Sequence, residues 1–224
     1  AMLMRWSKVS ADGKFTPPPS KQIAYNALIG TRVELFKYCS DELKKALSIA
    51  VRYSLVRKQF PRKDAPERGE VKLLDYPTHQ IRLFPMIAHA YVIHFTAIEI
   101  QAICDASLRD LESNLSTLPS LHATSSGLKA IGTWYTNDQL EIARQCLGGM
   151  GYSTYSGLPG MRADFAVQCT WEGDNTVLSL QCSRFLVKSF VKLIRSQKAG
   201  QDAPILSDVT NYLARIDLTN LCPD

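Results

Sequence analysis

The chain has 224 residues and a net charge of +5, and this length can bury a sizeable core within one large domain. Its fractions of charged (21%) and hydrophobic (46%) residues are typical of a soluble globular protein and exclude a disordered tail or a membrane bundle. Lys and Arg are scattered, so no nucleic-acid partner is indicated, although basic groups can still meet an anionic ligand such as a phosphate.

Neither the cysteines nor the histidines predict a metal site. The six cysteines show no Cys-x-x-Cys spacing, and we interpret them as buried thiols of a reducing compartment. His89 and His94 are too far apart in sequence to share a helix face as i, i+4 ligands. We therefore expect core or edge histidines at all four positions, which are 79, 89, 94 and 122.

The first predicted elements are a short strand-like start and a long helix. A turn at Asp12-Gly13 and a run of prolines separate the two. From Ser20, a candidate N-cap, to Phe60, apolar residues recur at intervals of three and four, which predicts a helix with Gly30 as its weak point.

A polar loop is predicted at 61–71, where Pro, Gly and charged residues cluster. A second helix follows from Leu74 to about Leu115, and Pro85 is expected to kink it. Its apolar window, LFPMIAHAYVIHFTAI, is shorter than the roughly 20 residues that a spanning helix needs. We therefore expect a buried helix and no membrane span.

The second half of the chain predicts two more helices. STLPSLHATSSG breaks the pattern, and a third helix is predicted from about Leu121 to Leu147. GGMGYSTYSGLPGMR holds too many Gly and Pro residues for a helix, and a fourth helix runs from near Asn175 to about Ser196, before a linker and another short helix. These segments predict an all-α fold, an up-and-down four-helix bundle with a short β-strand remnant at the N-terminus.

Common phosphate-binding and hydrolase motifs do not fit this sequence. GGMGYST has Thr154 where G-x-G-x-x-G needs its last glycine, and it follows a helix where that motif requires a strand. GYSTYSG likewise does not supply G-x-S-x-G, so a nucleophile elbow is unsupported.

One acidic residue, Glu172, stands between a tryptophan and a glycine just before the fourth helix. A partly dehydrated pocket beside Trp171 and Gly173 would make this carboxylate a stronger base, suited to removing a carbon-bound proton. The alternative is that Glu172 is a first-turn acid that complements the helix dipole, with Asp174 as the helix cap. Position in the sequence leaves both interpretations open.

Four segments together resemble the acyl-CoA oxidases, flavoenzymes related to the acyl-CoA dehydrogenases. They are SIAVRYSLVRKQF, SLHATSSGLKAI, CLGGMGYSTYSGLP and QCTWEGDNTVLSLQCSRFLVKS, in the order of the family. The similarity runs from MLMRW to about Ser189 and corresponds to the C-terminal helical-bundle portion of that family. It implies oxidation of a fatty acyl-CoA to a trans-2-enoyl-CoA, with FAD taking the hydride and O2 being reduced to H2O2. Glu172 matches the family's catalytic base.

The resemblance also implies a set of cofactor-binding residues. Arg57 and Phe60 match an Arg-x-x-Phe element in which the Arg meets the FAD pyrophosphate and the aromatic ring packs near the adenine; guanidinium groups suit phosphate oxygens. Gln145, Gly148 and Gly149 match a Gln-x-x-Gly-Gly element that lets the backbone approach the cofactor. The alternatives are a helix-end cation for Arg57 and a helix C-cap for the glycines.

Further residues are assigned with less sequence support. Gln80 and Thr176 are candidates for the same cofactor, although polar residues at helix ends are common. Tyr152, Trp171 and Gly173 are assigned to substrate binding. The family's FAD site is shared between subunits, so the resemblance implies a homodimer, and it implies residence in the peroxisome, although LCPD is no peroxisomal targeting ending.

Complete family members also carry an N-terminal helical region, a β-domain and a second C-terminal helical domain. We therefore interpret 1–18 as the end of the β-domain and a linker, 19–198 as the helical-bundle domain that binds FAD and acyl-CoA, and 199–224 as a linker toward a second helical domain. Pro61 and Met150 depart from residues that relatives often have there. An acyl-CoA dehydrogenase, and a non-catalytic helical module that binds an acyl chain or a partner, remain as alternatives.

Overall fold

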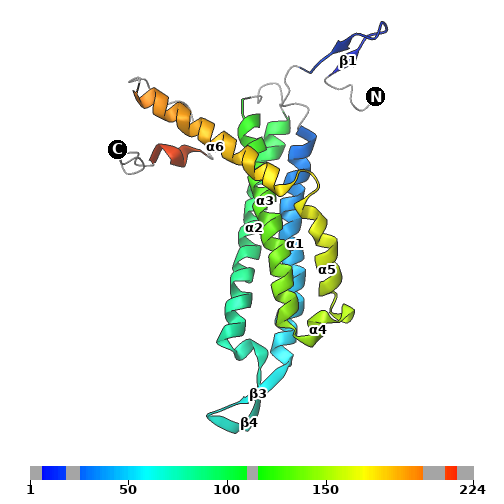
Figure 1. Cartoon of the computed structure of the whole chain (residues 1–224), viewed down its shortest axis with the longest axis vertical. Coiled ribbons are helices and arrows are strands. Elements are labelled where there is room, and N and C mark those ends of the chain that lie inside the picture. Colours follow the sequence, from blue (N-terminus) through cyan, green and yellow to red (C-terminus); the bar gives the residue numbers. More distant parts are fainter. Residues whose placement is uncertain (1–6, 19–25, 110–115, 199–209, 216–224) are drawn as a thin grey trace.

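The computed structural model describes residues 7–18, 26–109, 116–198 and 210–215, which form an elongated helical molecule (Figure 1). Three long helices, α1 (Asn26–Val56), α2 (Pro77–Arg109) and α3 (Leu118–Cys146), run side by side with alternating direction. α1 packs extensively against both α2 and α3, whereas the contact between α2 and α3 is smaller. The predicted all-α class is confirmed.

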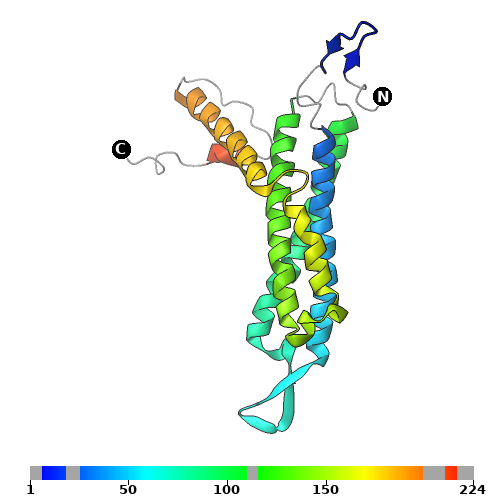
Figure 2. The same ribbon diagram turned by 45° about the vertical axis from the view of Figure 1, so that its right-hand side comes forward.

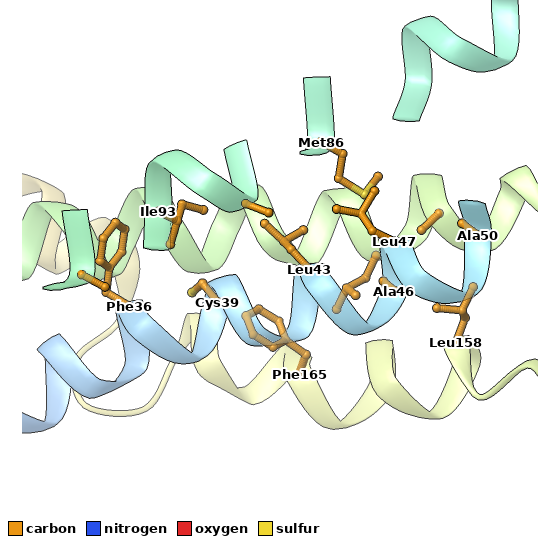
Figure 3. Close-up of a cluster of buried hydrophobic side chains, with 14 of the residues drawn as sticks. Phe36, Cys39, Leu43, Ala46, Leu47, Ala50, Met86, Ile93, Leu158 and Phe165 are labelled. Atoms are coloured by element: carbon orange, nitrogen blue, oxygen red, sulfur yellow. The ribbon is translucent and has the colours of Figure 1, made fainter. Parts of the chain in front are cut away.

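Two further helices pack on this three-helix core in different ways. The short α5 (Leu158–Phe165) lies along α3 and places Phe165 and Leu158 against α1 (Figure 3). The longer α6 (Asn175–Lys198) packs on α3 and leans away from the other helices, as two views agree (Figure 2). The fourth long helix therefore lies across one face of α3, and α5 fills the position alongside α1.

The core consists of the apolar faces of α1, α2 and α3 (Figure 3). On α1 the buried residues recur at three and four, because this spacing keeps side chains on one face of a helix. The predicted apolar face of α1 is largely confirmed, although Leu55 is 44% exposed. Buried members of the cluster include Phe36, Cys39, Leu43, Ala46, Leu47, Ala50, Met86 and Ile93.

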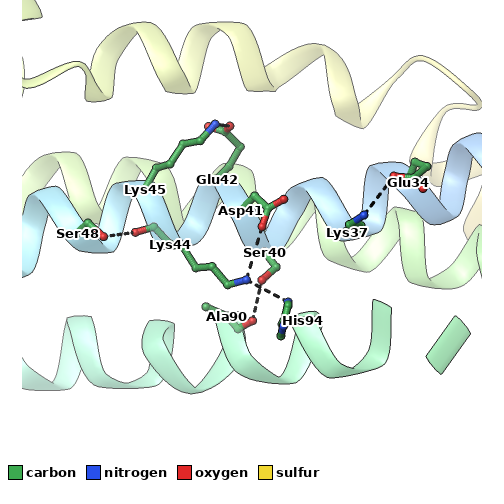
Figure 4. Close-up of polar contacts among 10 residues, drawn as sticks. All are labelled: Glu34, Lys37, Ser40, Asp41, Glu42, Lys44, Lys45, Ser48, Ala90 and His94. Atoms are coloured by element: carbon green, nitrogen blue, oxygen red, sulfur yellow. Dashed lines mark hydrogen bonds and ion pairs between the residues drawn. The ribbon is translucent and has the colours of Figure 1, made fainter. Parts of the chain in front are cut away.

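Polar contacts also join α1 to α2 (Figure 4). Ser40 is fully buried, and its Oγ donates a hydrogen bond to the backbone oxygen of Ala90 (3.0 Å). Lys44 Nζ lies 3.0 Å from His94 Nδ1. An ion pair between Lys45 and Glu42 (2.6 Å) stays within α1 and faces away from α2. Because this pair lies within one helix and Glu42 is buried, it stabilises the charge of Glu42 and does not join α1 to α2.

The first helix ends four residues earlier than predicted, at Val56. Phe60 precedes Pro61, whose ring disfavours a helical residue before it, and Phe60 itself has a positive φ of 57°. The stretch predicted as a polar loop is instead a hairpin, formed by β3 (Lys58–Arg62) and β4 (Ala65–Lys72). Charged residues, prolines and a glycine make up most of its strands, so the sequence shows no alternation of apolar and polar residues that would predict them.

Two other predictions about helices were wrong. α3 begins at Leu118, inside the stretch predicted to break the pattern, because Pro119 occupies the first helical turn, where a missing N–H costs nothing. The Gly- and Pro-rich stretch after α3 forms α4 (Gly149–Tyr152) and α5. Gly157, with φ 74°, separates the helical turns there, and Pro159 again stands in a first turn.

The remaining elements agree with the sequence where they are described. A small hairpin, β1 (Lys8–Val9) and β2 (Phe15–Thr16), encloses the predicted turn, and α1 continues through Gly30. A short helical turn at Asn211–Arg215 follows α6. The predicted N-cap at Ser20 and the predicted end of the second helix near Leu115 lie outside the described residues.

The apolar stretch of α2 is longer, and more of it is exposed, than predicted. In length and composition, its segment Pro77–Ser107 (31 residues) is sufficient to cross a membrane, so the expectation of a short window was wrong. Only 33% of its most apolar window is buried. A core helix of a soluble protein can have the same length and apolar composition, and one face of α2 does enter the core. Its other face exposes an apolar stripe, formed by Ile81, Phe84, Tyr91, Val92, Phe95 and Ile98.

Candidate active site

Glu172 lies on the tight turn that connects the last 3-10 turn before α6 with the first residue of α6. Its φ is +55°, in the left-handed region, and the next residue, Gly173, has φ +116°. The side chain is half-buried near the start of α1, where the Thr31 hydroxyl donates a hydrogen bond to Glu172 Oε2 (3.0 Å). A residue other than glycine in this conformation costs about 1–3 kcal/mol, which the surrounding contacts must offset.

Two buried cations contact the backbone of this turn. Arg32 (4% exposed) donates from Nε to the carbonyl oxygen of Glu172 (2.9 Å). Lys129 (0% exposed) donates from Nζ to the carbonyl oxygen of Gly173 (2.7 Å). Burial lowers the pKa of both Arg32 and Lys129, and the charge of Glu172 opposes this effect at Arg32. The two consecutive carbonyl groups thus accept hydrogen bonds from α1 and from α3.

Neither cation was singled out from the sequence. A signal existed for Arg32, because it follows Ile29 at the helical spacing that places both on the buried face of α1. A long basic residue on an apolar face is rarely buried without a partner. For Lys129, its neighbours along the α3 face are small or hydroxyl-bearing, such as Ser126 and Thr133, and leave room for a partner from another element.

The alternative interpretation gave Glu172 the role of a first-turn acid and Asp174 that of the helix cap, and the structure separates the two. Asp174 is the helix cap, since its Oδ1 accepts hydrogen bonds from the backbone N–H groups of Thr176 (2.9 Å) and Val177 (3.3 Å). Glu172, however, precedes α6, whose first turn contains no acidic residue. The interpretation of Glu172 as a first-turn acid was therefore wrong, whereas that of Asp174 as a cap is confirmed.

Three predicted residues lie in or directly beside the turn that carries Glu172. Gly173 cannot be replaced without strain, because an added Cβ would lie 2.8 Å from Leu178 Cδ2 and its φ is positive. Trp171 is 50% exposed and donates from Nε1 to Gln168 Oε1 (2.6 Å). Thr176 is exposed in the first turn of α6. These three predicted residues lie within four positions of Glu172.

A second group of predicted residues meets at the opposite end of the bundle. Arg57, Gln145, Gly148 and Gly149 line one cavity of about 480 Å³, where the C-terminal ends of α1 and α3 meet the first turns of α2. Arg82 lines the same cavity and donates from Nη2 to Gln145 Oε1 (3.4 Å). Two guanidinium groups in one cavity suit the oxygens of a phosphate or pyrophosphate.

The glycines of this cavity leave open space beside the backbone. A Cβ added at Gly148 or Gly149 would meet nothing within 4 Å, and Gly148 has a positive φ of 58°. Met150 lines the same cavity. With the two arginines, these features fit the phosphate-bearing part of a dinucleotide cofactor.

Three predicted residues lie elsewhere. Phe60 is 67% exposed and lines a separate cavity of about 880 Å³ beside the β3–β4 hairpin. Gln80 donates from Nε2 to the backbone oxygen of Leu74 (2.9 Å) and does not line the cavity of Arg57. Tyr152 is 84% exposed on α4, next to Glu141 and Arg162, so the structure does not bring it to Glu172.

The residues around Glu172 and the residues around Arg57 are separated by nearly the whole length of α1. Thr31, which contacts Glu172, lies near the start of this helix, and Arg57 follows its last residue. At about 1.5 Å of rise per residue, the stretch between them spans roughly 40 Å. This exceeds the reach of one dinucleotide, so one chain cannot place both groups on the same cofactor molecule.

His79 borders the cavity of Arg57 and is expected to make the protein less stable in acid. Its Nε2 lies 2.7 Å from Ser54 Oγ, which itself donates to the backbone oxygen of Ala50 (2.6 Å). Burial, and then the charge of Arg82, lower the pKa of His79 from its ordinary value of 6.5. The unfolded chain therefore takes up a proton that the folded chain does not bind, and stability falls as the pH drops through and below 6.5.

Urea unfolding at pH 7.5 and pH 5.5 measures this effect. We expect His79→Gln to lose less stability than the wild type between the two pH values, because glutamine does not titrate. An equal loss in both proteins would show that His79 does not contribute.

The remaining histidines and cysteines agree with a structural role. His89 stacks on Tyr135 with ring centroids 4.2 Å apart, and His122 Nδ1 lies 3.3 Å from Arg32 Nη1. Among the described residues no group of three or more His, Cys, Asp or Glu side chains is arranged to hold a metal ion. Cys39, Cys104 and Cys146 are buried, as predicted, and burial raises the pKa of Cys39 to about 12, whereas Cys169 and Cys182 are half-buried. Cys222 lies outside the described residues.

Comparisons with known proteins agree with the resemblance. The chain is 36% identical over 231 residues to acyl-coenzyme A oxidase 2 of Yarrowia lipolytica, covering 98% of this chain and 32% of that protein. It is 38% identical over 212 residues to peroxisomal acyl-coenzyme A oxidase 1 of Rattus norvegicus, covering 93% of this chain and 31% of that protein. The chain thus spans about a third of the length of the curated relatives it matches.

Solved structures and a family match lead to the same conclusion. Acyl-CoA oxidase-2 of Caenorhabditis elegans, bound with FAD, ascaroside-CoA and ATP, matches with a TM-score of 0.86 and 40% identity, over 94% of this chain and 31% of that one. Arabidopsis thaliana acyl-CoA oxidase 1 matches with a TM-score of 0.82 and 37% identity, over 93% of this chain and 31% of that one. Residues 25–187 match the acyl-CoA oxidase C-alpha1 domain. The chain belongs to the acyl-CoA oxidase family.

Proposed function

We propose that this chain is the helical part of an acyl-CoA oxidase and that Glu172 is its catalytic base. In this reaction Glu172 removes the α-proton of a fatty acyl-CoA, which is oxidised to the trans-2-enoyl-CoA. The observation that carries the proposal is the placement of Glu172 on a turn held by Thr31 and by Arg32. A thioester α-proton is only weakly acidic, so a base that removes it must be held in place and partly dehydrated.

The chain's own residues have distinct tasks in this proposal. The Thr31 hydroxyl holds Oε2, and we assign Oε1 to the substrate α-carbon. Trp171 and Gly173, which flank Glu172 in the sequence, would contact the acyl thioester. At the other end of the bundle, Arg57, Arg82, Gln145 and the two glycines of the cavity would hold FAD by its phosphate-bearing part. Bound FAD would supply the acceptor for the β-hydride, and its reoxidation by O2 would yield H2O2.

An absorbance spectrum of the purified chain tests this function. We expect a flavin spectrum that is bleached by anaerobic addition of a fatty acyl-CoA and that returns in air with release of peroxide. Bleaching without peroxide would instead indicate an acyl-CoA dehydrogenase. A folded protein that binds no added FAD would contradict the proposal and favour a non-catalytic helical module.

The proposal includes a homodimer with shared cofactor sites. Its support is the separation of roughly 40 Å between Thr31 and Arg57, because one FAD cannot contact both ends of one α1. The exposed apolar stripe of α2 is the kind of surface that a partner covers. Each site would then combine Glu172 of one subunit with Arg57 of the other.

Subunit complementation tests the sharing of sites. We expect Glu172→Gln and Arg57→Glu to be inactive separately and to regain activity when unfolded and refolded together. A mixed dimer carries both changes in one site and leaves the other site intact, so random pairing restores about a quarter of the wild-type activity. Sites contained within single chains would give no recovery, with each refolded variant alone as the control.

The location and the domain boundaries complete the proposal. The rat relative is named peroxisomal, which supports a peroxisomal location for the whole protein that contains this chain. We propose 19–198 as the helical-bundle domain, 1–18 as the end of a β-domain and 199–224 as a linker. Import of the whole protein into peroxisomes, followed by microscopy, checks the location.

A further inference from the structure

Lys129 is the largest side chain that is fully buried in the described part of the chain. Its ammonium group has three donors, and two of them go to oxygens of the turn that carries Glu172. Nζ donates to the carbonyl oxygen of Gly173 (2.7 Å) and to Asn175 Oδ1 (2.9 Å). A buried cation is costly unless it is paired or hydrogen-bonded, so these two contacts account for its presence on α3.

The hydrogen bonds of Lys129 continue through Asn175, whose side chain is itself fixed by α3. Asn175 is 1% exposed, and its Nδ2 donates to Thr133 Oγ1 (2.9 Å) and to the backbone oxygen of Ala130 (3.3 Å). The amide of Asn175 thereby has one orientation, with Oδ1 toward Lys129. The start of α6 is thus joined to one turn of α3.

Lys129 and Arg32 donate hydrogen bonds to the carbonyl oxygens of two consecutive residues. Arg32 Nε binds the carbonyl oxygen of Glu172 (2.9 Å), and Lys129 Nζ binds that of Gly173. Both residues of the turn have positive φ values, 55° and 116°. Such a backbone persists only where its surroundings over-determine it, and the two cations are the charged groups that bind it.

We propose that Lys129 is a positioning residue of the proposed oxidation: by binding the Gly173 carbonyl group it sets the direction in which the Glu172 carboxylate points. This inference rests on the proposed function. Lys129 touches neither substrate nor cofactor in this role, because its whole side chain is buried beneath the turn. A displacement of the base by about 1 Å costs roughly 10²-fold in rate, which gives the size of the expected effect.

The test compares Lys129→Met with Thr133→Val in the FAD-loaded chain. Both changes remove a buried polar contact from the same network, but only the first frees the Gly173 carbonyl group. For Lys129→Met we expect kcat to fall by roughly 10²-fold with KM and FAD content unchanged. In the cofactor-free chain we expect faster hydrogen exchange at the amides of 171–174. Thr133→Val should keep kcat, KM, FAD content and exchange at 171–174 close to the wild type, because Asn175 Nδ2 keeps its bond to the Ala130 carbonyl oxygen and Lys129 keeps its bond to the Gly173 carbonyl oxygen.

Each other outcome has a definite meaning. Near-wild-type turnover in Lys129→Met, or an equal loss in Thr133→Val, would overturn the positioning role alone. If both Lys129→Met and Lys129→Gln fail to fold or to bind FAD, Lys129 serves the fold and the proposal is wrong. A wild-type chain that binds FAD but is not bleached by acyl-CoA would instead overturn the proposed function, and the role of Lys129 with it.

Discussion

Replacing Glu172 by glutamine is expected to slow the anaerobic bleaching of the flavin by acyl-CoA by roughly 10²–10⁴-fold, the usual contribution of a general base. Glutamine has nearly the same shape, and its amide oxygen can still accept the hydrogen bond of the Thr31 hydroxyl. The variant loses only the ability to take a proton. FAD content and stability should therefore stay at the wild-type level.

A matched control for this variant lies on the same part of α1. Glu34 is exposed and forms a surface ion pair with Lys37 (3.9 Å), and it lies three positions after Thr31. Glu34→Gln removes the same charge near the same helix end and should leave the bleaching rate unchanged, because surface pairs contribute little. Rapid-mixing absorbance of both variants makes the comparison. An unchanged rate in Glu172→Gln would remove Glu172 from the role of base.

Gly151→Ala is expected to destabilise the protein by about 1–3 kcal/mol, the usual cost of an overpacked site. An added Cβ would lie 1.8 Å from the backbone oxygen of Arg144 and 3.3 Å from Leu147 Cβ. A backbone atom cannot rotate away, so α4 must move off the end of α3. Gly148 and Gly149 move with it, and FAD affinity should fall as well.

Gly149→Ala supplies the control for the stability measurement. It lies in the same short helix, and an added Cβ would meet nothing within 4 Å. In the cofactor-free chain we expect this change to be neutral or to stabilise by up to about 1 kcal/mol, because alanine loses less conformational freedom in a helix. Urea unfolding of the two variants decides the matter. Equal stabilities would show that the close contact at Gly151 is relieved at no cost.

The long helices were predictable because each buries one continuous face. In α1 and α6 the apolar residues recur with the helical period, and the structure places both helices within a few residues of the predicted range. The ends were less predictable, since helix termini depend on single residues. Pro119 begins α3 where a break was expected, and Pro61 follows α1 within a hairpin that carries almost no apolar pattern.

Part of the candidate site was also predictable. Glu172, Gly148 and Gly149 were found from short motifs, because these motifs place particular residue types on turns at helix ends. Tyr152 was expected near the substrate for the same reason, yet α4 carries it to the end of the bundle away from Glu172. Nearness in sequence did not become nearness in space, since α5 runs the chain back along the bundle between them.

By itself, the amino-acid sequence determined the all-α class, the long amphipathic helices and the motifs that identify the family, because these depend on local spacing and residue type. Only the tertiary structure decided what surrounds Glu172. Thr31 and Arg32 are about 140 residues away in the chain, and Lys129 binds the turn from α3. A helical period states which face of a helix is buried, but not which element covers that face. The partners of a buried Arg or Lys are therefore settled by the packing of the helices.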